Sequence, residues 1–195
     1  MRVIAGEAHG RRIGAPRGLN TRPATARVRA SIFSRLSARF DLRGARVLDL
    51  FAGSGSLGLE ALSRGASSAV FVDAARSAAN AITRNLKTFG FQTRARVVAR
   101  EVMAALAALG AANERFDLVF IDAPYANDIT TDVLEALARF ELSAPRGWMV
   151  ARQAESAIAP AIPAGLECVS QATLGDHRLI LYRRAEPAPA ESGMA

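Results

Sequence analysis

Short apolar runs alternate with amphipathic segments along the middle of the chain. Segments at about 56–64, 75–89, 101–110 and 128–140 carry apolar residues at helical spacing. Between and beside them lie apolar runs short enough for buried strands, centred on Leu48, Val70, Val97, Val119 and Met149. This alternation predicts an α/β fold, with a mostly parallel sheet and right-handed crossovers.

The two ends of the chain follow a different pattern. Cys168 and the run 179–181 predict two final strands, which makes a seven-stranded sheet with a terminal antiparallel hairpin. Residues 2–5 and 12–15 predict a small N-terminal β-hairpin, and apolar spacing predicts a helix over 25–40. We therefore expect a basic N-terminal extension at 1–40, a main domain at 41–184 and a disordered tail at 185–195, which is rich in Pro, Ala and Glu.

The first predicted strand runs into a glycine-rich turn. Gly53 and Gly55 allow a tight turn and a close approach of ligand, and the next helix directs free N–H groups back at the turn. Asp73 ends the second apolar run, 20 residues after Gly53, at the spacing of an acid that binds ribose hydroxyls. These features predict an adenosine-containing ligand and fit the dinucleotide fingerprint as well.

Asp49 helps to separate the adenosine ligands. A carboxylate four residues before Gly53 is a poor neighbour for a diphosphate and suits a cation better, such as the sulfonium of S-adenosylmethionine. The alternatives are that Asp49 only caps backbone amides of the turn and that Asp73 is an ordinary loop acid.

A polar tetrapeptide, residues 122–125, follows the fourth apolar run. Asp122 offers a side-chain acceptor and Ala123 a backbone carbonyl, while Pro124 keeps the preceding residue extended. Tyr125 offers a flat face for an unstacked base. Two acceptors aimed at one NH2 group would orient its lone pair toward a methyl donor, although a plain strand-to-loop exit has a similar composition. Neighbouring strands would bring this site beside the glycine turn.

Positive charge gathers at the start of the chain. Of the 195 residues, the first 46 hold 11 arginines against Glu7 and Asp41, whereas the rest is near neutral. Such clustering is typical of a nucleic-acid partner, with a solvated face as the alternative. One cysteine and two scattered histidines indicate no metal site, and we expect a cytoplasmic monomer without a membrane span or signal peptide.

Several motifs occur in order along the chain. They are MRVIAG at 1–6, GRR at 10–12, TRP at 21–23, RVR at 27–29, VLDLFAGSG at 47–55, LEALSRGA at 59–66 and DAPY at 122–125. With them the chain resembles the bacterial small-subunit ribosomal RNA guanine-N2 methyltransferase family (the RsmD family), from Met1 to about Tyr182. The resemblance implies a Rossmann-like class I methyltransferase fold, S-adenosylmethionine as donor and a guanine of 16S rRNA, in an assembling or assembled small subunit, as acceptor.

The resemblance also implies roles for residues. The catalytic set would be Asp122, Ala123, Pro124 and Tyr125. The donor set would be Asp49, Phe51, Ala52, Gly53, Ser54, Gly55, Asp73, Ala74, Glu101 and Val102. The basic segment offers RNA contacts at Arg11, Arg12, Arg22, Arg27 and Arg29.

This sequence departs from the family pattern at a few positions. Ala123 replaces a usual proline but keeps the carbonyl, and Ala26 and Ala30 stand where acids are usual. Glu101 replaces the usual aspartate after the third strand and can still accept from an adenine amine. An adenine or cytosine amine of DNA, a non-catalytic RNA-binding role and an NAD-linked activity remain alternatives; the last is disfavoured by Asp49.

Overall fold

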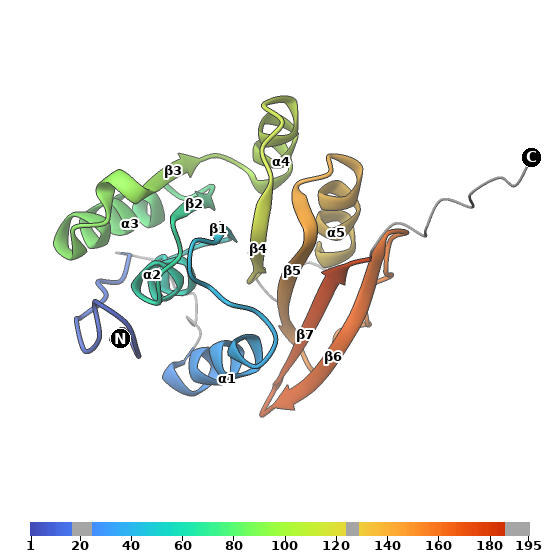
Figure 1. The fold of residues 1–195 in the computed structure, drawn as a ribbon, viewed down its shortest axis with the longest axis horizontal. Coiled ribbons are helices and arrows are strands. Elements are labelled where there is room, and N and C mark those ends of the chain that lie inside the picture. The colour runs from blue at the N-terminus through green and yellow to red at the C-terminus, as the bar shows by residue number, and fades with distance from the viewer. Residues whose placement is uncertain (17–24, 124–128, 186–195) are drawn as a thin grey trace, which may run out of the picture.

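The computed structural model describes residues 1–16, 25–123 and 129–185. Within them, helices and strands alternate along the chain, as the sequence predicts (Figure 1). The helices are α1 (Ala26–Ser37), α2 (Ser56–Ser63), α3 (Arg76–Phe89), α4 (Val102–Ala111) and α5 (Thr130–Arg139), with a 3-10 turn at Gln92–Arg94. The strands are β1 (Arg46–Leu50), β2 (Ser68–Asp73), β3 (Ala95–Ala99), β4 (Phe116–Ile121), β5 (Ser143–Ala154), β6 (Leu166–Leu174) and β7 (His177–Arg184).

The strands form one sheet in the order β3-β2-β1-β4-β5-β7-β6. The first five strands in this order are parallel, and β7 pairs antiparallel with both β5 and β6. The prediction of a mostly parallel seven-stranded sheet with a terminal antiparallel hairpin is therefore confirmed. Because β1 and β4 are neighbours, their two motifs reach the same edge of the sheet.

Two apolar cores lie on the two faces of the sheet. Alternate residues of each strand point to opposite faces, so Phe71 and Phe120 join one core while Val72 and Ile121 join the other. The first core is covered by α1, α2 and α3, and the second by α4 and α5 (Figure 1). This three-layer arrangement holds the carboxyl ends of the parallel strands in fixed positions.

The N-terminal segment packs into the first core. Val3, Ala8 and Ile13 are buried there together with residues of α1, so the expected extension shares its core with the sheet. The predicted hairpin is reduced to one antiparallel bridge, between Arg2 and Arg12. Between the two bridged residues, Gly6 lies directly against α2, because a Cβ there would be 1.8 Å from the Ser63 carbonyl oxygen.

The N-terminal segment is fastened to α2 by a buried acid. The Glu60 carboxylate accepts from the backbone N–H groups of Ile4 (2.7 Å) and Ala5 (3.0 Å) and is fully buried. Arg64 Nε donates to the same carboxylate at 2.8 Å, which compensates its charge. The boundary expected near residue 40 stays a prediction, and the tail from 186 onward lies outside the described residues.

Candidate active site

The two sequence motifs meet at the carboxyl edge of β1 and β4. Leu50 is paired in parallel register with Ile121, so the turn after β1 and the segment after β4 begin side by side. The pKa of Asp49 is raised partly by the negative charge of Asp122, which places the two acids within electrostatic reach. A ligand at this edge would therefore contact both motifs.

The glycine turn has positive φ angles at Phe51 (55°), Gly53 (55°) and Gly55 (75°). A Cβ on Gly53 would have the Phe51 carbonyl oxygen, at 3.9 Å, as its one near neighbour, so this position is open to a ligand. A Cβ on Gly55 would instead meet Ile82 at 3.1 Å and Phe71 at 3.2 Å. A ligand can therefore approach Gly53, as predicted. Gly55 does not leave such room, because it serves the turn and its packing against α3.

Asp73 is oriented by the turn itself. One carboxylate oxygen accepts from the Gly53 N–H at 2.8 Å, and the other accepts from the Ala75 N–H at 2.9 Å. Each oxygen keeps a further lone pair, and the residue is half-buried rather than covered. A carboxylate oriented in this way can accept hydrogen bonds from a pair of hydroxyl groups.

Asp49 lies below the turn and is almost completely buried. Its Oδ2 accepts from the Gly58 N–H in the first turn of α2 at 2.9 Å, which is the capping role that the sequence left open. Burial raises the pKa of Asp49 well above its usual range, and the charges of Asp122 and Asp73 raise it further. A cation bound above the turn would relieve this repulsion.

The remaining donor candidates surround the same turn. Ala52 donates to the Val72 carbonyl at 3.0 Å, and Ser54 is buried. Ala74 and Glu101 are exposed, and Val102 is buried at the start of α4. Because Asp73 is paired with Ala99 on β3, Glu101 follows at the same edge. The structure thus brings the predicted donor residues together along three adjacent strand ends.

The acceptor side of the edge centres on Asp122. Its Oδ1 accepts from Arg152 Nε of β5 at 2.5 Å, and the two side chains are 16% and 7% exposed. Ala123 is buried, whereas Pro124 and Tyr125 lie outside the described residues. The sequence did not single out Arg152, because its partner is 30 residues away and no local motif marks it.

Asn85 of α3 is a second residue that the sequence did not indicate. Its side chain accepts from the Gly14 N–H at 2.9 Å and donates to the Gly14 carbonyl at 2.9 Å. It also donates to the Ser54 carbonyl at 3.0 Å, so it ties the N-terminal segment to the glycine turn. An asparagine inside a helix is usually an ordinary surface residue. The position of Asn85 in the sequence therefore did not indicate these contacts.

The arginines predicted to contact RNA differ in their surroundings. Arg12 and Arg27 are exposed, while Arg11 donates to the Thr88 and Phe89 carbonyls at the end of α3. Arg22 lies outside the described residues. Arg29 requires a correction, because it is completely buried and donates to the Arg2 carbonyl at 2.7 Å. Burial lowers the pKa of Arg29, and its role is to hold the N-terminal segment.

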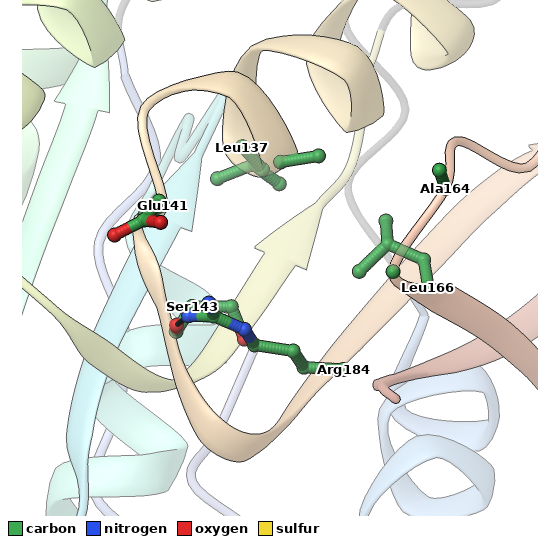
Figure 2. A pocket seen from close by; sticks show the side chains of 8 residues that line it. Leu137, Glu141, Ser143, Ala164, Leu166 and Arg184 are labelled. Carbon is green, nitrogen blue, oxygen red and sulfur yellow. Dashed lines mark hydrogen bonds between the residues drawn. The ribbon is translucent and has the colours of Figure 1, made fainter. Parts of the chain in front are cut away.

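Two hollows flank the sheet. One, of about 370 Å³, lies between the start of α1 and the β6–β7 turn and is lined by Thr25, Arg27, Val28 and residues 174–177. It is near the acceptor side, since Arg152 is paired with Leu179 in this hairpin. Figure 2 shows the other, of about 90 Å³, beside Ser143 and Arg184 at the opposite end of β5. It has room for a few water molecules only.

The described residues contain no group of three or more His, Cys, Asp or Glu side chains that could hold a metal ion. Nor does any helix within these parts of the chain have the length and apolar character needed to cross a membrane.

The strand order and the acids at the β1, β2 and β4 ends define a class I methyltransferase fold. The solved structure of yhhF from Escherichia coli is similar, with a TM-score of 0.83 and 32% identity over 94% of this chain and 97% of that chain. YlbH of Bacillus subtilis (strain 168) is 35% identical and covers 94% of this chain and 99% of its own length. Ribosomal RNA small subunit methyltransferase D of Escherichia coli (strain K12) is 31% identical, covering 94% of this chain and 90% of its own length.

The family model described as conserved hypothetical protein 95 matches residues 1–183, and the chain belongs to this family. Membership of the RsmD family, as the motifs indicated, is thereby confirmed.

Proposed function

We propose that this protein transfers a methyl group from S-adenosylmethionine to an exocyclic base amine of ribosomal RNA, with guanine N2 of 16S rRNA as the target. The observation that carries this proposal is the adjacency of the Asp49–Gly53–Asp73 turn and Asp122 at one edge of the sheet. The name of the Escherichia coli relative, a small-subunit rRNA methyltransferase, supports the RNA substrate. A substrate of this kind agrees with the cytoplasmic location expected from the sequence.

The donor half of the edge fits S-adenosylmethionine. The open side of Gly53 leaves room for a ligand, and the oriented Asp73 carboxylate suits ribose hydroxyls. Asp49 and Asp122 make this edge electronegative, which favours a sulfonium and disfavours a diphosphate. Glu101 is exposed at the same edge and would accept from the adenine amine. Calorimetry should therefore detect binding of S-adenosylhomocysteine to the protein and no binding of NAD.

The acceptor half fits an amine donor. The Asp122 carboxylate is 16% exposed, so it can accept from an NH2 group while staying mostly shielded from water. Ala123 would contribute its backbone carbonyl, and Tyr125 would stack on the base once it has left its own stack. Two acceptors on one amine would direct its lone pair toward the donor half. Acceleration would come chiefly from positioning.

The bound donor supplies a methyl group on a positively charged sulfur. Transfer to the amine nitrogen would leave the sulfur as a neutral thioether, which keeps the electron pair of the carbon–sulfur bond, and the methylated nitrogen would release a proton to water. Asp49 and Asp73 would hold the donor, Asp122 would align the amine, and no covalent bond to the chain would be formed.

Positive charge at the start of the chain would bind the RNA backbone. Arg12 and Arg27 are exposed and free to meet phosphates, whereas Arg29 is not. The hollow beside Arg27 is lined in part by His177, which is paired with Ala154, two residues after Arg152, and it has the size of a small-ligand pocket. A nucleotide next to the target could lie there.

The test is mass spectrometry of rRNA nucleosides from cells that lack the gene. We expect one N2-methylguanosine to be missing from 16S rRNA and to return with the wild-type gene. The Asp122→Ala gene should not restore it. If the rRNA is unchanged and a methylated adenine or cytosine amine is missing from DNA instead, the substrate is DNA and the RNA proposal is wrong.

A further inference from the structure

The partner of Asp122 comes from the neighbouring strand. Ile121 of β4 is paired with Ala151 of β5, so the next residue on each strand, Asp122 and Arg152, emerges at the same level. Phe120 and Val150, two residues earlier, both face the first core, and strand alternation places Asp122 and Arg152 on that same face. Arg152 Nε then donates to Asp122 Oδ1 at 2.5 Å.

This contact joins two groups that are largely withdrawn from water. The Arg152 side chain is 7% exposed and the Asp122 side chain is 16% exposed. An N–H donor directed at one carboxylate oxygen favours one orientation of the carboxylate, because the hydrogen bond prefers the lone-pair direction. Within the described parts of the chain, the other oxygen, Oδ2, has no hydrogen-bond donor.

The charges at this edge also need balance. Burial and the charges of Asp122 and Asp73 raise the pKa of Asp49, so three acids converge where the donor would lie. The guanidinium of Arg152 offsets one of these charges at Asp122.

We propose that Arg152 is a positioning residue, which occupies Oδ1 of Asp122 and thereby presents Oδ2 to the amine that is methylated. This inference rests on the proposed function. Arg152 does not touch the reacting atoms in this account, and its effect passes through the orientation of Asp122.

The proposal has an unusual consequence for an asparagine at position 122. Arg152 can only donate, so it would hold the amide oxygen of that asparagine and turn the NH2 group toward the substrate amine. Two donors would then face each other. Replacing Arg152 by glutamine removes this constraint, because the glutamine oxygen can accept from the asparagine NH2 and leave the asparagine oxygen for the substrate.

The experiment compares wild type, Asp122→Asn, Arg152→Gln and the double variant. Single-turnover rates are measured with saturating donor and RNA, and KM for RNA is measured separately. We expect each single variant to be slower by about tenfold or more, and the double variant to be at least about tenfold faster than Asp122→Asn. KM should change by less than about twofold, since the effect falls on the transition state. Arg183→Gln, which breaks the exposed Arg183–Glu167 pair on the same sheet, is the matched control and should keep the wild-type rate.

A double variant whose loss is the product of the two single losses would overturn the proposal, since it would show that Arg152 and Asp122 act independently in spite of their contact. A merely structural Arg152 would instead lower stability or raise KM for RNA without a selective loss of the single-turnover rate. Arg152→Gln alone leaves a buried carboxylate uncompensated and can fail to fold. The comparison of Asp122→Asn with the double variant then decides, because neither contains that carboxylate. Asp122→Asn leaves the Arg152 guanidinium uncompensated, so thermal unfolding of both variants must show that they are folded to the same extent. A wild-type protein that methylates no amine would refute the proposed function itself, whereas an active wild type with multiplicative losses refutes only the role of Arg152.

Discussion

The donor half and the acceptor half of the edge hold their acids in different ways. In the donor half, Asp49 and Asp73 accept from backbone N–H groups of the adjoining turn and helix. In the acceptor half, Asp122 is held by the side chain of Arg152 from another strand. Backbone amides are fixed by the fold, whereas a side-chain partner can be exchanged by one substitution. The orientation of the acids in the donor half therefore depends on the backbone, and that of Asp122 in the acceptor half depends on one side chain.

The largest effect should follow from a substitution in the donor half. Asp73→Ala removes the acceptor for the Gly53 and Ala75 amides together with the contact proposed for the ribose. Charge-assisted hydrogen bonds contribute about 1.5–3 kcal/mol each. We expect donor affinity to fall by about 3 kcal/mol, or roughly 150-fold. Calorimetry with S-adenosylhomocysteine measures this loss.

Asp73→Asn is the graded control for that measurement. Asp73→Asn keeps one acceptor oxygen, so its loss of donor affinity should be several times smaller than that of Asp73→Ala. A change of less than about threefold in Asp73→Ala would mean that the turn binds the donor without this acid.

A smaller effect should follow from the charge of Asp49. Its raised pKa means that the carboxylate becomes charged only as pH rises above the usual carboxyl range. Attraction to the sulfonium is thus gained with rising pH and lost on acidification. The affinity for S-adenosylmethionine relative to uncharged-sulfur S-adenosylhomocysteine should rise with pH, by about tenfold in all. Asp49→Asn should remove this dependence, and a wild-type ratio that does not change with pH would refute the electrostatic role.

The smallest effect concerns the exposed arginines that lie outside both halves. Arg12→Ala combined with Arg27→Ala should weaken RNA binding and reduce its salt slope by up to about 2, because fewer counterions are released. Donor affinity should not change. Arg139→Ala combined with Arg183→Ala removes two exposed arginines from the α5 and β7 region and is the control. Equal salt slopes for the two pairs would indicate that Arg12 and Arg27 form only a solvated face.

The difference between the halves also explains what the sequence could predict. The alternation of apolar runs was sufficient for the sheet and its helices. The local spacing of Asp49, Gly53 and Asp73 was sufficient to place these three residues at one edge of the sheet, while their roles toward the donor stay predictions. Arg152 could not be predicted, because its contact depends on the parallel register of β4 and β5. Burial of Arg29 was missed for a similar reason, since an arginine in a basic segment gives no local sign that the chain folds over it.

The central claim is that the donor half binds the methyl donor while Asp122 acts in transfer. The most direct measurement is the single-turnover rate of Asp122→Ala on rRNA, together with its affinity for S-adenosylhomocysteine. Asp117→Ala is the control, because Asp117 lies on the same strand and accepts from the Arg46 N–H at the opposite end. We expect Asp122→Ala to lose about 1.5–3 kcal/mol of transition-state stabilisation, or tenfold to a hundredfold in rate, with donor affinity unchanged. An Asp122→Ala protein as fast as Asp117→Ala would contradict the account.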